Sequence, residues 1–177
     1  LSPEKKAIKK KNLFNPCDHV VVQNASLINC GNNPPSPQLW LSEGQRNKAA
    51  QLLPGQNGRK ILAIGPTATF PGKMWPPDYF SRLLNDLSAP GEIFENYNFA
   101  VFGAPDEIDM AKPLLDSLDK DRCINLIGRT NPGEGAACLS RCDMYIGNDS
   151  GLMHCAAALN IPTFGLFGPS PEYNYHP

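Results

Sequence analysis

The chain has 177 residues with 16 basic and 17 acidic side chains, a formal net charge of −1, and 41% hydrophobic residues. This length and apolar content favour one folded domain with a tail and exclude a disordered chain. The near-neutral charge provides no electrostatic footprint for nucleic acid, so we expect no nucleic-acid partner. No apolar run approaches the ~20 residues needed to span a bilayer, and the N-terminus lacks the apolar segment of a signal peptide. We therefore expect a cytoplasmic protein.

Residues 1–58 differ in composition from the rest of the chain. We interpret the basic block EKKAIKKK near the start as the solvated face of a terminal helix. The stretch NCGNNPPSPQLWL is rich in proline and asparagine and does not suit regular structure, and helices are expected on either side of it, near 18–29 and 42–53. We expect residues 1–58 to form an interdomain linker or docking segment.

A regular pattern begins at residue 59 and continues to residue 177. Helices are expected near 77–88, 105–118, 133–141 and 151–159, and they alternate with short apolar runs bounded by glycine: KILAIG, NFAVFG, CINLIG, MYIGN and TFGLFG. Such runs, separated by helices, are typical of buried parallel strands in βαβ units. The predicted fold class is therefore α/β, a doubly wound parallel sheet that resembles a Rossmann domain.

The expected strand order is 3-2-1-4-5, because right-handed crossovers and helices on both faces favour a sheet whose order reverses once. The first and fourth strands are then neighbours. Ligands of open α/β sheets bind at this reversal, outside the carboxyl ends of the strands. The loop PTATFPGKMW after strand one should therefore face NDSGLMH after strand four.

The turn GNDSGLMH allows three interpretations. A nucleophile elbow requires GxSxG, which is absent here, and nothing orients His154 as a base for Ser150. Asp149 or Ser150 could act as an N-cap of the following helix. That role leaves Gly151 unexplained, because a glycine in the first turn lets a ligand approach the backbone. The free N–H groups of Gly151, Leu152 and Met153 favour an anion site that suits a diphosphate.

Two other loops supply candidate ligand contacts. Lys73 provides a cation and Thr67 and Thr69 provide hydroxyl donors in the loop after strand one, a combination that suits phosphate. Trp75, followed by two prolines, is interpreted as a packing residue. Glu107 follows strand two and could accept from ribose hydroxyls, or it could simply favour the first turn of a helix.

Six cysteines and three histidines provide no local metal motif. No two cysteines form a CxxC pair, and Cys138, Cys142 and Cys155 lie among alanines and leucines, where free thiols behave as small hydrophobes. We expect structural thiols, no metal and no cofactor.

The ordered blocks GPTATFPGKMWPPDYFSRLL, FGAPDE, INLIGRT and YIGNDSGLMHCAAALNIPTFGLFGPSPE carry a family resemblance over about residues 60–172. Together they resemble the donor-binding half of glycosyltransferase family 9, the lipopolysaccharide heptosyltransferases. The resemblance implies a GT-B architecture, in which two Rossmann-like domains enclose the substrates and the second holds the nucleotide sugar. It also implies metal-independent, inverting transfer, usually of heptose from ADP-heptose to a lipopolysaccharide core acceptor at the inner face of the bacterial inner membrane, with peripheral membrane association of the whole enzyme.

Matched residue by residue, the resemblance implies that Lys73 contacts phosphate and Glu107 contacts ribose. Arg129 and Thr130 would lie beside the base, and Asp149 would meet sugar hydroxyls. The backbone from Ser150 to Met153 would hold the diphosphate together with His154. Pro132 stands where the family usually has leucine. This difference leaves open where the helix near 133–141 starts and which nucleotide base the donor carries.

In the family, the acceptor domain and its catalytic aspartate precede the linker helix. We therefore expect the catalytic base to lie outside this chain and the isolated chain to be inactive in transfer. Two alternatives stay open: a sugar-nucleotide epimerase of GT-B shape, which would be favoured by glutamates after the DSG turn, and a noncatalytic nucleotide-binding module. The segment CAAAL after the turn contains no glutamate.

Overall fold

A computed structural model describes residues 18–27, 34–55 and 58–177. The basic block EKKAIKKK, Cys17 and Cys30 lie outside the described residues. The chain divides into two compact units, one formed by the segment up to Pro37 together with Pro171–His176, and the other by Gln38–Ser170. No helix of the described residues is long and apolar enough to cross a membrane.

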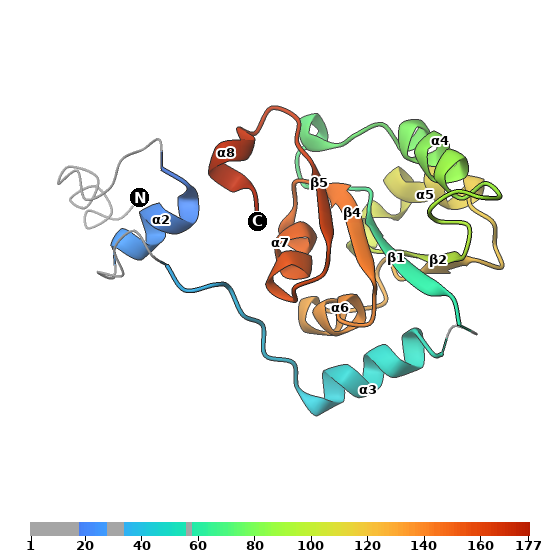
Figure 1. Cartoon of the computed structure of the whole chain (residues 1–177), viewed down its shortest axis with the longest axis horizontal. Coiled ribbons are helices and arrows are strands. Elements are labelled where there is room, and N and C mark those ends of the chain that lie inside the picture. The colour runs from blue at the N-terminus through green and yellow to red at the C-terminus, as the bar shows by residue number, and fades with distance from the viewer. Residues whose placement is uncertain (1–17, 28–33, 56–57) are drawn as a thin grey trace. The chain divides into compact units, whose positions relative to one another are not determined.

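The larger unit is built on a five-stranded parallel sheet with the order β3-β2-β1-β4-β5 (Figure 1). This confirms the predicted α/β class and strand order. Parallel pairing places Gly65 opposite Gly147, so the carboxyl ends of β1 and β4 lie together. The strands are β1 (Lys60–Gly65), β2 (Tyr97–Val101), β3 (Cys123–Asn125), β4 (Met144–Asn148) and β5 (Thr163–Leu166).

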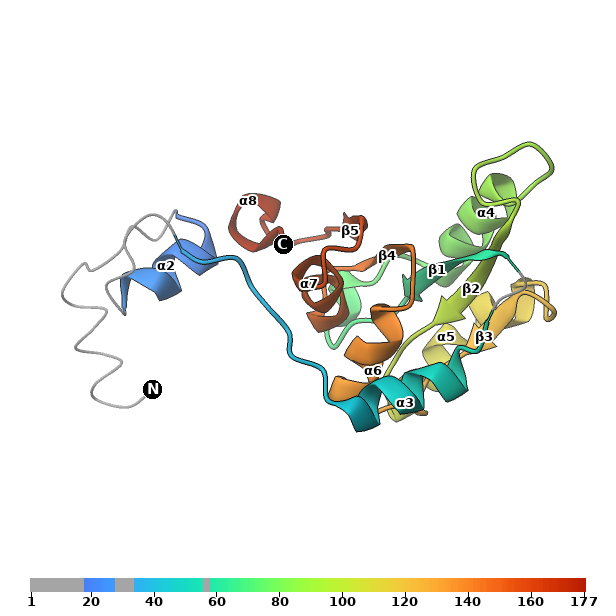
Figure 2. The ribbon, with the colours of Figure 1, turned by 60° about the horizontal axis from the view of Figure 1, so that its bottom comes forward.

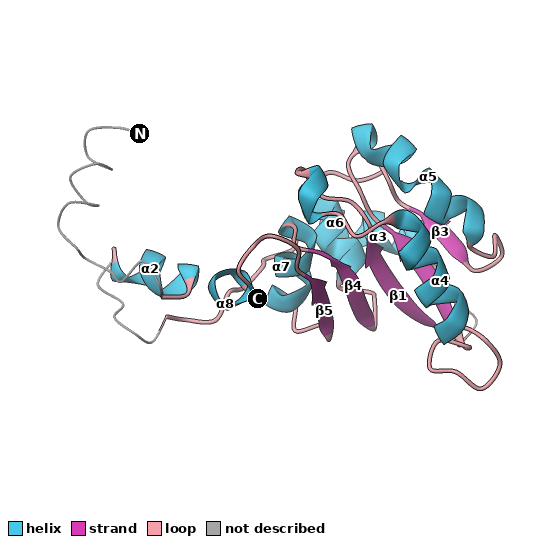
Figure 3. Cartoon of the chain, turned by 90° about the horizontal axis from the view of Figure 1, so that it is seen from above, coloured by secondary structure: helices cyan, strands magenta, loops and turns pink. Residues whose placement is uncertain are grey.

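Helices cover both faces of the sheet (Figure 3), which is why β1 is buried continuously from Ile61 to Gly65 and does not alternate between buried and exposed residues. On β1, Ile61 and Ala63 enter the core cluster that contains residues of α3, α6 and α7, whereas Leu62 and Ile64 enter the cluster of α4 and α5. Figures 1 and 2 show α3 and α6 side by side. The helices are α3 (Glu43–Leu52), α4 (Pro77–Leu87), α5 (Ile108–Ser117), α6 (Pro132–Leu139) and α7 (Gly151–Ala158).

Local signals in the sequence start most of these helices. Ser42 and Gln45 form a capping box at α3, and Asn131 and Glu134 form another at α6. Pro132 occupies the first turn of α6, where proline is favoured because its missing N–H has no intrahelical partner. Pro132 is therefore compatible with a regular start of α6.

The helix α3 belongs to the larger unit, although the sequence placed it within the segment 1–58. Ala49 and Leu53 are fully buried in the core, and Arg141 Nε donates to the Leu53 carbonyl oxygen at 3.0 Å. The compact unit therefore starts before residue 59, at Gln38. The role of residues 1–58 as an interdomain linker stays a prediction.

The smaller unit contains α2 (Val20–Ser26) and α8 (Glu172–Tyr175). His19 caps α2, because its Nδ1 accepts from the Val21 N–H at 3.2 Å. Its Nε2 lies 2.7 Å from the carbonyl oxygen of His176. The His19 ring thus joins the two chain segments of this unit.

Glycines lie in register across three strands at the carboxyl edge of the sheet. Gly147 of β4 pairs with Gly65 of β1 on one side and with Gly165 of β5 on the other. A Cβ on Gly65 or Gly147 would collide with the hydroxyl of Tyr145, and a Cβ on Gly165 would collide with the sulfur of Met153. The missing side chains therefore let Tyr145 and Met153 pack directly against the strands.

We expect Gly147→Ala to destabilise the larger unit by about 1–3 kcal/mol, the usual cost of overpacking. The added Cβ would meet the Tyr145 hydroxyl and would also lie 2.7 Å from the backbone oxygen of Gly65, which a side-chain rotation cannot relieve. Gly44→Ala in α3 is the control, because a Cβ there meets nothing within 4 Å. In urea denaturation, the midpoint of Gly147→Ala should be lower than that of wild type, and the midpoint of Gly44→Ala should not be lower. Equal midpoints for the two variants would contradict the packing argument.

Candidate functional site

A cavity of about 670 Å³ opens at the carboxyl ends of the strands, where the strand order reverses. Its lining comes from the loops after β1 and β2, the start of α6 and the first turn of α7. Seven residues predicted from the sequence line it: Thr67, Thr69, Glu107, Thr130, Ser150, Gly151 and Leu152. The two unusual loops therefore meet where the strand order predicted.

The first turn of α7 faces this cavity without a cap. Ser150 is the N-cap residue, in extended conformation, and its side chain accepts no hydrogen bond from the helix. The expected side-chain cap is therefore absent: Ser150 occupies the N-cap position without that hydrogen bond, and Asp149 accepts from Lys73 instead, although both residue types favour capping. A Cβ on Gly151 would meet nothing within 4 Å, so the helix end is open to a ligand. The early N–H groups and the positive helix end form an anion-binding arrangement.

Lys73 and Asp149 form an ion pair beside the cavity. Lys73 ends the 3₁₀ turn η1 (Pro71–Lys73), and its Nζ donates to Asp149 Oδ2 at 2.6 Å. The Asp149 side chain is 5% exposed and the Lys73 side chain 28% exposed. Burial raises the pKa of Asp149, but hydrogen bonds from Lys73 and Ser170 and the charges of Lys73 and His154 outweigh burial and hold that pKa below its usual range. Asp149 is therefore a carboxylate near neutral pH.

Asn148, which the sequence analysis did not single out, holds the loop after β1 against the end of β4. It is fully buried. Its Oδ1 accepts from the Trp75 N–H at 2.9 Å, and its Nδ2 donates to the Pro66 carbonyl oxygen at 2.7 Å. One side chain thus binds both ends of the loop that carries Lys73. In the sequence, only its position at the end of a strand and directly before Asp149 could have indicated this role.

Trp75 packs rather than lines the cavity. Its ring meets Phe80 edge-on at 5.1 Å between centroids and Tyr79 at 5.6 Å. It also belongs to the partly buried shell of the core cluster on the α4 face. The predicted packing role of Trp75 is confirmed.

Thr67 and Glu107 lie together at the cavity, although 40 positions separate them. Glu107 Oε2 accepts from Thr67 Oγ1 at 2.8 Å and from the Ala104 N–H at 2.7 Å. Both bonds use the same oxygen, which leaves Oε1 for a ligand. Glu107 also ends the 3₁₀ turn η2 (Pro105–Glu107) before α5, so its local structural role and its position at the cavity coexist.

Five other predicted residues do not line the cavity: Lys73, Arg129, Asp149, Met153 and His154. Arg129 is exposed and its Nη1 donates to the Asn125 carbonyl oxygen at 3.2 Å. Met153 is fully buried in the core, so only its backbone could serve a ligand. His154 is exposed on α7, and Lys73 is held by Asp149.

Small and apolar residues form the rest of the lining. They carry no chemical signal in a sequence, because their contribution is the shape of the cavity and the absence of bulk. Pro132 and Asn131 join them at the start of α6. Examples that the sequence analysis did not identify are Gly103, Ala104, Pro105, Gly135, Ala136 and Cys155.

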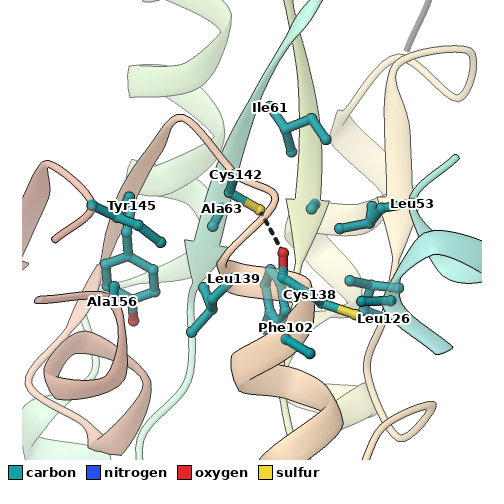
Figure 4. Close-up of a cluster of buried hydrophobic side chains, with 14 of the residues drawn as sticks. Leu53, Ile61, Ala63, Phe102, Leu126, Cys138, Leu139, Cys142, Tyr145 and Ala156 are labelled. Atoms are coloured by element: carbon teal, nitrogen blue, oxygen red, sulfur yellow. Dashed lines mark hydrogen bonds between the residues drawn. The ribbon is translucent and has the colours of Figure 1, made fainter. Parts of the chain in front are cut away.

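The four cysteines within the described residues are free thiols. Cys142 Sγ lies 3.4 Å from the Cys138 carbonyl oxygen inside the core (Figure 4). Burial, reinforced by the Glu134 carboxylate, raises the pKa of Cys138 to about 11, and burial also raises the pKa of Cys155. High thiol pKa values suit packing rather than nucleophilic chemistry. The described part of the chain contains no group of three or more side chains that could hold a metal ion.

The Asp149 ion pair predicts a pH-dependent contribution to stability. Because the folded-state pKa of Asp149 is lower than its unfolded value of about 3.9, the stabilisation is complete above about pH 5 and is lost as pH falls through the folded pKa. The difference in unfolding free energy between wild type and Asp149→Asn should therefore be constant near neutrality and shrink in acid. Asp116→Asn is the control, because Asp116 pairs with Lys112 while 65% exposed and such pairs contribute little. A difference for Asp149→Asn that does not change with pH would contradict the argument.

The chain matches a known protein family over most of its length. The family model described as glycosyltransferase family 9 (heptosyltransferase) matches residues 8–177. Lipopolysaccharide heptosyltransferase 2 of Escherichia coli is 33% identical over 142 residues, which are 77% of this chain and 39% of that protein. Lipooligosaccharide heptosyltransferase 2 of Haemophilus influenzae is 36% identical over 146 residues, 77% of this chain and 41% of that protein.

Solved structures show the same fold. The E. coli ADP-heptose lipopolysaccharide heptosyltransferase II superposes with a TM-score of 0.66 at 32% identity, over 78% of this chain and 41% of that chain. A family 9 glycosyltransferase from Veillonella parvula gives a TM-score of 0.78 over 93% of this chain and 48% of that one, at 23% identity, which supports the fold alone. The chain thus spans about two fifths of the length of the relatives it matches in sequence. The chain belongs to glycosyltransferase family 9, the heptosyltransferase family.

Proposed function

We propose that the larger unit binds a nucleoside-diphosphate sugar, ADP-heptose, as the donor domain of a heptosyltransferase. The observation that carries this proposal is the uncapped first turn of α7, which opens onto the cavity at Gly151. Free N–H groups at a helix N-terminus are suited to phosphate oxygens. The capped α3 and α6 lack this property, because their capping boxes already use early N–H groups.

The cavity suits a nucleotide in size and in the placement of its polar groups. Its volume of about 670 Å³ lies within the range of small-molecule sites, roughly 300–1,000 Å³. In the proposed pose the diphosphate lies at α7, and the ribose hydroxyls donate to Glu107. The base lies toward Thr130 and the start of α6, among small and apolar lining residues. Arg129, turned toward Asn125, has no part in this pose.

The Lys73–Asp149 pair supplies the remaining contacts. Lys73 is bonded to Asp149, which lies two residues before the start of α7, so in the proposed pose its ammonium contacts the diphosphate while Asp149 accepts from sugar hydroxyls. The pair also keeps a carboxylate beside the helix N-terminus neutralised while the site is empty. Exposed His154 on the same helix would reach the outer phosphate only after its side chain turns toward the ligand.

In the proposed reaction an acceptor hydroxyl of the lipopolysaccharide core attacks the anomeric carbon, and the bond to the diphosphate breaks with inversion. A carboxylate outside this chain removes the acceptor proton, while the α7 end and Lys73 stabilise the charge of the departing ADP without a metal ion. The names of the relatives support the substrates: one E. coli structure is an ADP-heptose heptosyltransferase, and another heptosyltransferase was solved with ADP-2-deoxy-2-fluoro heptose. Transfer at the cytoplasmic face of the inner membrane would follow from such an acceptor. Family membership favours this function over an epimerase or a noncatalytic module.

Calorimetric titration with ADP tests the proposal, together with Gly151→Val. Wild type should bind ADP more tightly than adenosine, because the diphosphate contacts α7. The valine side chain would occupy the open space at Gly151 and abolish most ADP binding, while a β-branched residue in a first helical turn costs the fold only tenths of a kcal/mol.

Gly44→Val is the matched control, since Gly44 lies exposed in the first turn of α3 with nothing within 4 Å of its Cβ position. It should leave ADP affinity unchanged. If wild type does not distinguish ADP from adenosine, or if Gly151→Val binds ADP normally, the anion site is misplaced and the proposed function fails.

Lys73→Ala should weaken ADP binding by about 1.5–3 kcal/mol, roughly 10- to 150-fold, the range for a charge-assisted hydrogen bond. Thermal unfolding must accompany the titration, because the substitution also leaves the buried Asp149 carboxylate without its cation. Lys112→Ala removes a lysine from the exposed pair with Asp116 and should change neither property measurably. Unchanged ADP affinity in folded Lys73→Ala would remove Lys73 from the site.

A further inference from the structure

Two hydroxyl groups beneath the first turn of α7 lack hydrogen-bond partners. Tyr145 of β4 is fully buried, and its hydroxyl oxygen makes no hydrogen bond of standard geometry. The Ser150 Oγ is likewise buried and unpaired, although Ser150 lines the cavity. Buried polar groups are nearly always paired in folded proteins, so each such group requires an explanation.

The fold makes room for the Tyr145 hydroxyl specifically. A Cβ on Gly65 or on Gly147 would collide with the hydroxyl oxygen, whereas the ring of Tyr145 packs in the core cluster with Met153 and Ala156 of α7. Figure 4 shows the ring directed from β4 toward α7, with the hydroxyl at its far end. A phenylalanine would retain the ring packing and would avoid burying an unpaired oxygen, which destabilises a folded state. Packing therefore accounts for the ring of Tyr145 and leaves its hydroxyl unexplained.

The two hydroxyls lie close to each other. Burial raises the pKa of Tyr145, and the Ser150 hydroxyl is near enough to oppose that rise in part. Cys155, one turn along α7, also contributes to the raised pKa of Tyr145. Both Ser150 and Cys155 belong to the cavity lining. Each hydroxyl hydrogen rotates about its C–O bond, so either group can donate to the other.

A bound phosphate would decide the direction of that hydrogen bond. Phosphate oxygens only accept, so the Ser150 hydroxyl must turn its proton toward the ligand, which leaves its lone pairs for another donor. In this arrangement the phenolic O–H of Tyr145 is that donor, because Tyr145 interacts with Ser150 from the core cluster and does not belong to the cavity lining. A chain of hydrogen bonds that all point the same way polarises its members and strengthens each of them.

We propose that Tyr145 is a positioning residue, whose hydroxyl donates to Ser150 Oγ and thereby directs the Ser150 proton to a phosphate oxygen of the bound donor. This inference rests on the proposed function, because it requires a phosphate at the end of α7. It identifies a contribution from the core of the sheet to ligand binding. Tyr145 itself does not touch the ligand.

The test combines Tyr145→Phe, Ser150→Ala and the double variant, each titrated calorimetrically with ADP and with adenosine. Tyr145→Phe should keep or raise the urea midpoint of the empty protein and weaken ADP binding roughly three- to tenfold, the effect of one hydrogen bond. Adenosine affinity should not change, because adenosine has no phosphate. In the Ser150→Ala background, Tyr145→Phe should have no further effect on ADP.

Tyr97→Phe is the control, since Tyr97 lies at the opposite end of the sheet, at the start of β2, and should bind ADP as wild type does. If wild type binds ADP and Tyr145→Phe binds it equally well, the inference is overturned while the proposed function stands. Equal losses for ADP and adenosine would also overturn it, because they would indicate a packing role. Failure of wild type to bind ADP at all would overturn both proposals.

Discussion

The parallel pairing of β1 with β4 is the constraint on which the rest of the site depends. It brings together the carboxyl ends of two strands that lie far apart in the sequence, with Gly65 opposite Gly147. The loop after β1 then lies against the loop after β4, and the buried Asn148 binds both ends of the first loop. Only in this arrangement does Lys73 reach Asp149. Sheet order therefore determines which charged groups meet before any ligand is present.

The helix α7 differs from its neighbours in how its first turn is satisfied. Side chains cap α3 and α6 through reciprocal hydrogen bonds. At α7 the two residues best suited to cap the helix do not do so, because the Asp149 carboxylate is bonded to Lys73 and the buried Ser150 hydroxyl makes no bond to the helix. Unsatisfied N–H groups at a helix end favour an anion. The missing side-chain cap therefore leaves early N–H groups of α7 available, which is the feature on which the proposed diphosphate site rests.

Missing side chains shape the site as much as polar ones do. In-register glycines on β1 and β4 leave space for the Tyr145 hydroxyl below the helix, and Gly151 leaves space for a ligand above it. Small residues at the start of α6 and after β2 leave the remainder of the cavity open. The start of α7 is thus open at Gly151. On the core side, α7 packs against the ring of Tyr145, whose hydroxyl makes no hydrogen bond of standard geometry.

The strands, the helices and the order of the strands in the sheet could be predicted from the sequence alone. Glycine-bounded apolar runs, prolines at helix starts and a polar turn before a helix are local signals, readable because periodicity and backbone conformation act over a few residues. Which polar groups meet depends on the tertiary structure. Asp149 pairs with Lys73 and does not cap the helix, and Arg129 bonds to the end of β3 while Thr130 lines the cavity. Asn148 and Tyr145 are both buried. These contacts join loops that are remote in sequence. The distances between such loops are set by the register of the sheet, and no local signal in the sequence encodes that register.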